Sequence, residues 1–400
     1  MHCVRTVTEN LYWVGANDHR LALFENIHPI PKGVSYNAYL LLDEKSVLFD
    51  TVDWSACRQL LENLEYLLNG TPLDYLVINH MEPDHCASIA DVIAVYPEAK
   101  IVCTAKAVGM MKQFFDFDVD SRAILVKEGD TISLGSHELT FVMAPMVHWP
   151  EVMVTYEKTE KILFSADAFG SFGAVDGNIF ADEIDDKVAW LSEARRYYTN
   201  IVGKFGMSVQ GLLKKAAGLE IRMICPLHSV IWREDLPWLI DKYLKWSSYT
   251  PEEKSVTIAY GSVYGHTEKA ADILAGKLAD RGIRHISVFD VSKTHPSYII
   301  ADAFRTSAIV FASITYNGGI FCNMDTLLHQ LAAHGLTNRT AALIQNGTWA
   351  ATTSKQMGEI LGTMKNIHVL ESDVTIKSAL KDNQEAELDA LADAIAASLQ

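Results

Sequence analysis

The amino-acid sequence predicts an α/β protein of two domains: an α/β sandwich built on two sheets, followed by an open, doubly wound parallel sheet. The chain has 400 residues, which is too long for one typical hydrophobic core. Residues 246–255, WSSYTPEEKS, are polar, contain a proline and are typical of a linker. The apolar patterns also differ on the two sides of this linker. We therefore place the domains at residues 1–250 and 255–400.

In the first domain, short apolar runs recur with both alternating and continuous patterns. Helical patterns lie between them, at residues 88–96 and around 190–217. This mixture indicates two sheets rather than one. The predicted strands fall at 11–15, 35–43, 46–52, 73–80, 100–105, 139–146, 161–167 and 221–228.

The second domain opens with the apolar run VTIAY at 256–260, a glycine-containing turn and a helix. Ala271, Ile273, Leu274 and Leu278 recur at helical spacing in that helix. Strands alternating with helices indicate a parallel sheet covered on both faces. The further strands are predicted at 286–291, 308–314, 341–347 and 367–372, and the last helix at 384–398.

Charge and composition exclude several classes of protein. The net charge is −16, and most of the acidic excess lies in residues 1–254, which argues against nucleic acid or anionic lipid as a main partner. No apolar run is long enough to cross a membrane and the N-terminus lacks a signal-peptide pattern, so we expect a cytoplasmic protein with no membrane partner.

The cysteines do not encode a metal or iron–sulfur site. Six of them are scattered along the chain, at positions 3, 57, 86, 103, 225 and 322. None forms a CxxC pair, so the sequence carries neither a rubredoxin-type site nor an iron–sulfur cluster motif. We interpret them as ordinary buried thiols in a reducing compartment.

The stretch NHMEPDHCAS at 79–88 concentrates potential metal ligands. His80, Glu82, Asp84 and His85 lie within six positions, at the carboxyl end of a predicted strand. A lone histidine or aspartate after a strand is more often structural. Four such residues in six positions favour a metal site instead, because α/β sheets place their sites at the carboxyl ends of strands.

Three further predicted strands end in the same way. LTFVMAPMVH delivers His148, KILFSAD delivers Asp167 and IRMICPLH delivers His228. With the cluster at 79–88 this gives four histidines, two aspartates and one glutamate. Seven ligands exceed the needs of one tetrahedral zinc and suit two metal ions bridged by a carboxylate. The mixture with carboxylates favours iron or manganese, although carboxylates also bind zinc.

Three loops of the second domain are typical of a flavin site. The first leaves a strand and enters a helix whose N-terminal amides can hold a phosphate, and it lacks the GxGxxG of dinucleotide folds. The other two combine polar residues, glycine and an aromatic residue, which suit the edge and faces of an isoalloxazine ring. The candidate contacts are Ser262, Val263, Tyr264, Gly265, His266 and Thr267; Ser313, Thr315, Tyr316, Asn317 and Gly318; and Asn346, Gly347, Thr348 and Trp349.

The metal-ligand pattern resembles that of the metallo-β-lactamase superfamily, whose hydrolases carry HxHxDH at this place. Here Glu82 replaces the second histidine, and this variant, followed by HWP at 148–150, resembles the flavodiiron proteins. The resemblance implies a metallo-β-lactamase-like αββα sandwich followed by a flavodoxin-like domain that binds FMN. Tyr264 departs from the hydroxyl residue usual in flavodoxins, but an aromatic residue there fits the flavodiiron family.

The resemblance also implies how the metal ligands are shared. His80, Glu82 and His148 would hold one iron; Asp84, His85 and His228 would hold the other, with Asp167 as the bridge. Asp50 matches an acid of the superfamily that orients the ligands, although it is almost as well explained as a cap at a strand end. Residues 16–36 match the family less well, and we expect His19 and His28 to be exposed loop residues.

For function, the resemblance implies reduction of O2 to water, of NO to N2O, or of both, at a di-iron centre. Electrons would pass through FMN from a separate donor such as rubredoxin. A head-to-tail homodimer, or a dimer of such dimers, would bring the flavin of one subunit to the irons of the other. The alternative is a dinuclear zinc hydrolase with a regulatory flavin domain, which Glu82 and the three loops disfavour.

Overall fold

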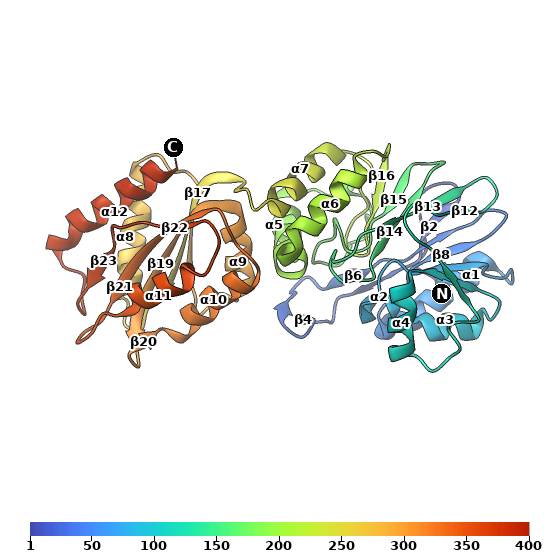
Figure 1. Cartoon of the computed structure of the whole chain (residues 1–400), viewed down its shortest axis with the longest axis horizontal. Helices are drawn as coiled ribbons and strands as arrows, with labels where there is room; N and C mark the ends of the chain where they lie inside the picture. The colour runs from blue at the N-terminus through green and yellow to red at the C-terminus, as the bar shows by residue number, and fades with distance from the viewer. Residues whose placement is uncertain (400) are drawn as a thin grey trace. The chain divides into compact units, whose positions relative to one another are not determined.

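The computed structural model describes residues 1–399 and separates into two compact units (Figure 1). The N-terminal unit comprises Met1–Tyr198 and Met207–Leu244. The C-terminal unit comprises residues 199–206 and the chain from Lys245 onward. A segment inside the first predicted domain, Thr199–Gly206, therefore groups with the C-terminal unit.

The N-terminal unit contains two mixed sheets, as the sequence predicts. The larger has the order β1-β2-β7-β8-β9-β10-β11, and the smaller has the order β12-β13-β14-β15-β16. The larger sheet consists of β1 (Arg5–Thr6), β2 (Leu11–Trp13), β7 (Tyr39–Leu41), β8 (Val47–Phe49), β9 (Tyr75–Val77), β10 (Lys100–Cys103) and β11 (Ala123–Leu125). The smaller consists of β12 (Thr131–Ser133), β13 (Glu138–Met143), β14 (Met153–Glu157), β15 (Ile162–Phe164) and β16 (Met223–Cys225).

The two sheets pack face to face through buried aromatic rings. Phe49 of β8 stacks on Phe164 of β15 with ring centroids 3.8 Å apart, and Tyr39 of β7 lies 5.6 Å from the same ring. Figure 1 shows α6 (Gly206–Ala216) and α7 (Leu236–Ser247) on one side of the sheets. The helices on the other side are α1 (Cys57–Leu68), α3 (Ile89–Val95) and α4 (Ala105–Phe114). This is the predicted αββα sandwich.

Amphipathic patterning explains why the outer helices pack on the sheets. In α1 the buried residues include Leu60, Leu64 and Leu68, each one helical turn from the next. The helix ends at Asn69, which adopts the left-handed conformation with φ of 45°. In α7, Leu239, Tyr243 and Trp246 are fully buried at the same spacing.

The shorter elements of the N-terminal unit form the loops around the site described below. Two small two-stranded sheets pair β3 (Ala16–Asp18) with β6 (Val34–Tyr36), and β4 (Leu23–Phe24) with β5 (His28–Pro29). The short α2 (Pro83–Cys86) follows β9. Helix α5 (Lys187–Tyr197) precedes a turn of π-helix at Tyr198–Val202.

The C-terminal unit is built on a parallel sheet with the order β18-β17-β19-β21-β22. In this order β17, the first strand along the chain, lies in the interior of the sheet, and β18 lies at its edge. The strands are β17 (Glu253–Gly261), β18 (Ile286–Asp290), β19 (Thr306–Tyr316), β21 (Arg339–Asn346) and β22 (Ile367–Val369). In addition, β20 (Gly319–Ile320) pairs with β19, and β23 (Val374–Ile376) pairs with β21. The helices are α8 (His266–Asp280), α9 (Pro296–Arg305), α10 (Cys322–Ala333), α11 (Thr353–Leu361) and α12 (Glu385–Ser398).

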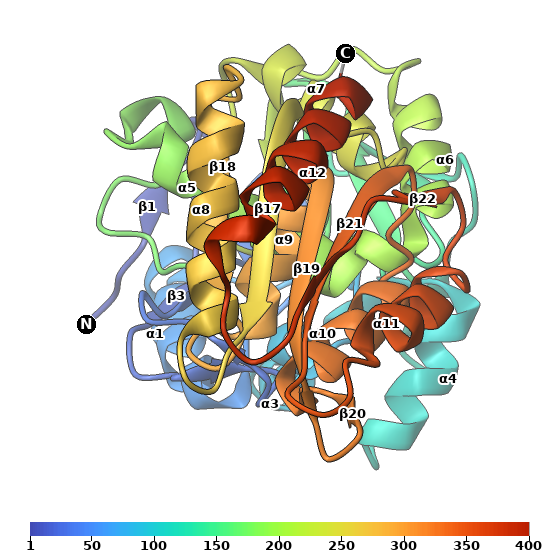
Figure 2. The same ribbon diagram turned by 90° about the vertical axis from the view of Figure 1, so that its left-hand side faces the viewer.

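Helices cover both faces of this parallel sheet, which confirms the predicted doubly wound fold. One hydrophobic core joins α8 and α12 to the sheet, and a second joins α9, α10 and α11 to its other face. In Figure 2, α8 and α12 lie in front of β17, β19 and β21. No helix among residues 1–399 is long and apolar enough to span a bilayer.

Two local predictions are wrong. The predicted linker at 246–255 is shorter, because α7 continues to Ser247 and β17 begins at Glu253. Thr315 and Tyr316 were expected in a loop after the strand predicted at 308–314, but they lie in the last part of β19, where they pair with β20. The antiparallel partner β20 extends the strand beyond the apolar run that predicted it.

Candidate metal centre and cofactor pocket

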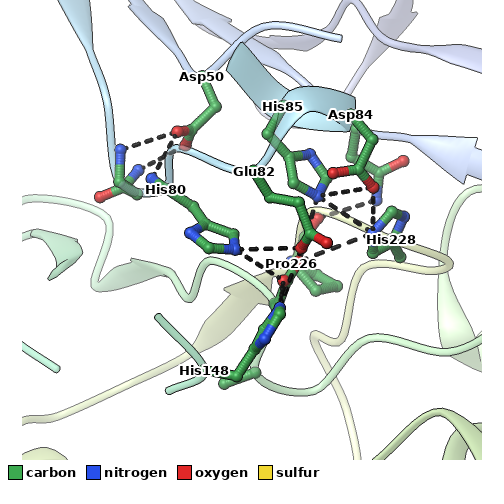
Figure 3. Close-up of polar contacts among 12 residues, drawn as sticks. Asp50, His80, Glu82, Asp84, His85, His148, Pro226 and His228 are labelled. Carbon is green, nitrogen blue, oxygen red and sulfur yellow. Dashed lines mark hydrogen bonds and ion pairs between the residues drawn. The ribbon is translucent and has the colours of Figure 1, made fainter. Parts of the chain in front are cut away.

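The turns that follow the strands of both sheets bring seven metal-binding side chains together. His80 lies three residues after the end of β9, and Asp167 and His228 lie three residues after β15 and β16. His148 comes five residues after β13, in the turn that leads to β14. Helix α2 and the residue before it carry the rest of the cluster, Glu82, Asp84 and His85 (Figure 3).

The first donor group consists of His80, Glu82, His148 and one oxygen of Asp167. Oε2 of Glu82 lies 3.3 Å from Nε2 of His80 and 2.9 Å from Nε2 of His148. Oδ2 of Asp167 lies 3.2 Å and 3.1 Å from the same two nitrogens. All four side chains are buried, and one donor atom from each lies within 4.8 Å of the others. The arrangement can hold one metal ion.

The second donor group consists of Asp84, His85 and His228. Oδ2 of Asp84 lies 3.3 Å from Nε2 of His85 and 3.2 Å from Nε2 of His228. The other oxygen of Asp167, Oδ1, lies 3.2 Å from Nε2 of His85. Because its two oxygens face different donor groups, Asp167 is placed to bridge two metal ions.

The chemistry of these atoms fits metal ions better than it fits hydrogen bonds. Nε2 of His85 and Nε2 of His228 face each other at 3.1 Å, and only one of two such nitrogens can donate to the other. Among the described residues, both oxygens of Asp84 and Oδ1 of Asp167 are buried without a hydrogen-bond partner. Buried polar groups left in this way indicate an ion or a ligand.

The imidazoles and carboxylates shift each other's pKa strongly. Burial lowers the pKa of His148, but Asp167 and Glu82 outweigh burial and raise it to about 9. Burial alone would raise the pKa of Glu82, but the hydrogen bonds from His148 and His80 outweigh it and lower that pKa. In the first donor group, positive and negative charges therefore already balance, and a metal ion would bind there by displacing protons from His80 and His148.

A second set of residues fixes the orientation of the ligands. Nδ1 of His80 lies 2.8 Å from Oε1 of Glu151, which also accepts a hydrogen bond from the amide of Met81. Nδ1 of His228 lies 2.7 Å from the carbonyl of Ser35. In both histidines the contact at Nδ1 directs Nε2 toward the centre. No sequence pattern marks Glu151, whose role depends on how the chain before β14 folds back onto the cluster.

Asp50 acts on the backbone of the ligand-bearing turn. Its carboxylate accepts hydrogen bonds from the amide of Asn79 at 2.7 Å, the side-chain amide of Asn79 at 2.7 Å and the amide of His80 at 3.2 Å. Figure 3 shows Asp50 beside this turn, with dashed lines joining its carboxylate to the turn. Burial raises the pKa of Asp50 to about 6 against the effect of these hydrogen bonds. Asp50 thus fixes the start of the 79–88 cluster.

Aromatic side chains form a wall against the second donor group. Phe24, Tyr36 and Tyr197 present their rings to His228, with centroids 5.5, 6.2 and 5.4 Å away. The hydroxyl of Tyr197 is buried without a hydrogen-bond partner among the described residues. Burial raises the pKa of Tyr197 well above its usual value, and the charges of Asp167 and Glu82 add to this shift. Tyr197 therefore stays a neutral hydrogen-bond donor beside the donor groups.

The segment that matches the family less well also approaches the cluster. His28 was expected to be exposed, but it is buried, with its ring 6.1 Å from Phe172. His19 is exposed, as expected. Glu25, which sequence reasoning missed, lies beside Glu82; burial and the charge of Glu82 raise the pKa of Glu25 to about 8. The hairpin of β4 and β5 thus adds polar groups to the edge of the site.

The expectation that all six cysteines are buried is wrong for two of them. Cys57, Cys86, Cys103 and Cys225 are buried, whereas Cys3 and Cys322 are exposed. Burial raises the pKa of the Cys86 thiol to about 12, so this thiol next to His85 stays protonated.

In the C-terminal unit, the three predicted loops meet around one cavity of about 420 Å³. Gly265, Ser313 and Gly318 do not line it, and Ile314, Ala350 and Ser378 line it in addition. The other predicted residues form its walls: Ser262, Val263, Tyr264, His266, Thr267, Thr315, Tyr316, Asn317, Asn346, Gly347, Thr348 and Trp349.

The local geometry of the cavity suits a phosphate at one end. Gly265 precedes α8 with φ of 88°, and no side chain caps the first turn of that helix. Its amides are therefore free to bind an anion. The hydroxyl of Ser262 accepts a hydrogen bond from the amide of Gly265 at 3.1 Å, and the side-chain amide of Asn346 donates to the hydroxyl of Thr267 at 3.3 Å.

Aromatic rings also line the cavity. Asn317 and Gly318 both have positive φ and form the two-residue turn between β19 and β20. Beside this turn Tyr316 is 48% exposed, and Tyr264 and Trp349 are 89% and 93% exposed. Large aromatic side chains with this much free surface are typical of a binding site. The rings and the polar loop ends fit a flat, edge-polar ring system.

Comparison with known proteins gives concordant matches for both units. A family model described as "ODP family beta lactamase" matches residues 34–229. An anaerobic nitric oxide reductase flavorubredoxin of Escherichia coli O1:K1 / APEC is 31% identical over 354 residues, which cover 86% of this chain and 72% of the relative. The flavorubredoxin of Shigella flexneri is 30% identical over 390 residues, which cover 95% and 79%.

Solved structures match over almost the whole chain. The rubredoxin oxygen:oxidoreductase from the anaerobe Desulfovibrio gigas has a TM-score of 0.92 and 29% identity, over 99% of this chain and 98% of that chain. The flavodiiron protein from Giardia intestinalis has a TM-score of 0.93 and 25% identity, over 100% and 98%. These matches extend across both units.

Proposed function

The chain belongs to the flavodiiron proteins and is an oxidoreductase, and from this premise we propose that it reduces O2 to water, NO to N2O, or both. One observation carries the proposal. A single chain combines a carboxylate-containing cluster for two metal ions with a cavity suited to a flavin. A hydrolase would need the first site but not the second.

We propose that the two donor groups hold two iron ions. His80, Glu82 and His148 would bind one and Asp84, His85 and His228 the other, with Asp167 between them. The distances support this division, because each oxygen of Asp167 faces its own group. Glu82 supports iron over zinc, since it contributes a hard oxygen donor where a hydrolase has an imidazole.

We propose that the cavity of the C-terminal unit holds FMN. The uncapped N-terminus of α8, with Ser262 and Thr267, would bind the phosphate. Tyr264, Tyr316 and Trp349 would contact the isoalloxazine ring, and the loop ends at Asn317 and Thr348 would hydrogen-bond its edge. When bound, the two irons and FMN would supply the redox chemistry, in which the gas is reduced with electrons relayed through the flavin.

The residues of the chain prepare the site for this chemistry. Glu151 and the carbonyl of Ser35 hold His80 and His228 with Nε2 toward the centre. Phe24 and Tyr36 exclude water from one side of the cluster. The hydroxyl of Tyr197 is left to donate a hydrogen bond to a small polar substrate, where negative charge develops as it is reduced.

The electron donor and the assembly are further parts of the proposal. The names of the relatives support rubredoxin or a similar protein as the donor. We also propose a head-to-tail homodimer, or a dimer of dimers, in which the flavin of one subunit serves the irons of the other. A fully active monomer in analytical ultracentrifugation would exclude this assembly.

Metal analysis, a visible spectrum and anaerobic turnover with each gas test the proposal together. We expect two iron ions and one FMN per chain, and consumption of O2 or NO by the protein when its flavin is chemically reduced. Comparing the two gases at equal concentration shows which one is preferred. Two zinc ions per chain, with hydrolysis of an ester or thioester and no gas consumption, would establish the hydrolase alternative instead.

A further inference from the structure

The turn that carries Asp167 has an unfavourable backbone conformation. Ala166 has φ of 51° and Phe169 has φ of 70°, so two residues with side chains adopt the left-handed conformation on either side of the aspartate. Residues other than glycine rarely adopt this backbone conformation, and it persists only where the surrounding structure holds it. The position of the Asp167 carboxylate therefore depends on whatever fixes this turn.

Most backbone groups of the turn are held by neighbouring backbone or by the turn itself. The carbonyl of Ala166 accepts a hydrogen bond from the amide of Leu227 at 3.0 Å. The hydroxyl of Ser165 donates to the carbonyl of Ala168 at 2.7 Å, and the amide of Gly170 donates to the carbonyl of Asp167 at 3.2 Å. The amide of Phe169 has no such local partner.

A tyrosine from a distant helix accepts the hydrogen bond of that amide. The amide of Phe169 donates to the hydroxyl oxygen of Tyr243, which lies 74 residues later in α7, at a distance of 2.5 Å. Tyr243 is fully buried, and its ring lies 4.3 Å from the ring of Phe169. A buried amide with no acceptor would be strongly unfavourable, so this contact stabilises the turn in its observed form.

The side chain of Phe169 is also held by packing. It is buried, and it borders a cavity of about 600 Å³ whose lining includes the apolar Leu163 and Ile240 and the charged Arg222 and Asp235. The hydrogen bond from the Phe169 amide to Tyr243 therefore adds to packing contacts and satisfies a backbone group that packing cannot satisfy.

We propose that Tyr243 is a positioning residue for Asp167. By accepting the hydrogen bond of the Phe169 amide, it holds the left-handed turn that places the two oxygens of Asp167 between the two donor groups. The inference rests on the proposed dinuclear centre, and it adds a residue of α7 that acts on the metal ions through the backbone. Partners that orient a ligand in this way commonly change metal affinity about 10-fold to 100-fold.

The test is Tyr243→Phe in the full-length protein with its metals and flavin. The substitution keeps the aromatic ring and removes the hydroxyl that accepts the hydrogen bond of the Phe169 amide. We expect the metal ions to be lost to a chelator about tenfold faster or more. We also expect a changed magnetic coupling between the two ions in the EPR spectrum of the mixed-valence form, because the bridging carboxylate has moved.

Tyr156→Phe is the matched control. The hydroxyl of Tyr156 donates to the carbonyl of Glu220 at 2.6 Å in the same unit, and Glu220 lies outside the Asp167 turn. This variant loses one tyrosine hydrogen bond as well, and we expect it to keep the metal retention and EPR spectrum of the wild type. If both variants lose metal equally fast, or if Tyr243→Phe retains metal like the wild type, the proposal is wrong.

A measurement on the unaltered protein keeps the inference testable if Tyr243→Phe does not fold. Hydrogen exchange of the segment 165–170 should be slow at the Phe169 amide; rapid exchange there would overturn the proposal. Metal loss is measured with whatever ions the protein carries. A protein that holds zinc would therefore refute the proposed function and still allow this test.

Discussion

At the scale of single residues, Glu82 distinguishes this metal cluster from that of a hydrolase. Its Oε2 lies within 3.3 Å of the Nε2 atoms of both His80 and His148, so it occupies the centre of the first donor group. Replacing this oxygen donor with an imidazole would give the hydrolase pattern HxHxDH. The metal preference should change with it, because imidazole is the softer ligand.

We therefore predict that Glu82→His lowers the iron-to-zinc ratio of the purified protein at least tenfold and abolishes gas consumption. Elemental analysis of protein produced with both metals supplied measures the ratio. Glu44→His, at an exposed position, serves as the control for the added histidine. An unchanged iron content in Glu82→His would show that Glu82 does not select the metal.

Tyr197 gives a second prediction at this scale, because its hydroxyl contributes nothing visible to stability. It is buried without a hydrogen-bond partner among residues 1–399, so Tyr197→Phe should leave the free energy of unfolding unchanged or raise it by about 1 kcal/mol. If the hydroxyl donates to the substrate, kcat should fall about 10-fold to 100-fold. Stopped-flow turnover together with thermal unfolding separates the two effects, and equal loss of metal and activity would contradict this role.

The sequence predicts the seven candidate ligands and, through the family resemblance, Asp50, but it does not predict Glu151 or Tyr197. The ligands stand out because chemically unusual residues recur at strand ends, as with His80, Asp167 and His228. Glu151 and Tyr197 carry no such signal. A glutamate before a strand and a tyrosine on an amphipathic helix are usual in any protein, and their roles arise only from the folded turn and helix packing.

At the scale of the elements, Asp43 ties the two sheets of the N-terminal unit together. It lies between β7 and β8 of one sheet and accepts hydrogen bonds from the hairpin of β12 and β13 in the other. The donors are the amide of His137 at 2.7 Å and the hydroxyl of Ser136 at 3.0 Å, and the ring Nδ1 of His137 lies 2.8 Å away. Burial opposes ionisation, but these hydrogen bonds outweigh it and lower the pKa of Asp43 to about 2.

A carboxyl group whose pKa is lowered by folding stabilises the folded state at neutral pH, and acid removes this stabilisation. The ionised carboxylate is favoured in the folded state above the ordinary pKa of about 3.8, and this advantage disappears as pH falls through about 2. We predict that Asp43→Asn lowers the free energy of unfolding by about 2 kcal/mol at pH 7, with a smaller difference from the wild type at pH 3. Thermal unfolding at both pH values tests this, and a constant difference would refute it.

Glycine positions in the C-terminal unit give a matched pair of substitutions. A Cβ at Gly347 would lie 2.0 Å from the carbonyl oxygen of Ala350, so any side chain must displace the loop that lines the cavity. A Cβ at Gly358, in α11, would meet nothing within 4 Å. We predict that Gly347→Ala lowers the FMN content of the purified protein severalfold.

Gly358→Ala should keep the FMN content and stabilise the protein by about 0.5–1 kcal/mol, because alanine favours a helix over glycine. Absorbance of released flavin, compared with protein concentration, measures both variants. Full flavin content in Gly347→Ala would mean that this loop does not form the flavin site.

The elements that the sequence predicts well are those with long apolar runs. β17, β19 and β21 are buried over most of their length and run for eight residues or more, so their apolar patterns are unambiguous. Strands of two or three residues, such as β4 and β5, are too short to show a period. The end of β19 was missed because an exposed hairpin, and not burial, extends it.

At the scale of the whole molecule, the metal cluster and the flavin cavity belong to different units. Each site should therefore be emptied without emptying the other. We predict that prolonged chelation abolishes gas consumption while the FMN content and the chemical reduction of the flavin stay unchanged. Elemental analysis and visible spectra of the treated protein check this; flavin release in step with metal loss would contradict it.

The segment Thr199–Gly206 has a consequence for how the chain can be divided. It groups with the C-terminal unit, while the residues on both sides of it group with the N-terminal unit, so the polypeptide crosses from one unit to the other three times. A hydrogen bond joins this segment to the rest of the C-terminal unit: the hydroxyl of Tyr249 donates to the carbonyl of Gly203 at 2.8 Å. If two domains were simply joined end to end, the polypeptide would cross between them only once. No single scission can therefore free either unit intact, and an attempt to graft this flavin unit onto another enzyme must carry an eight-residue insert taken from the middle of its neighbour.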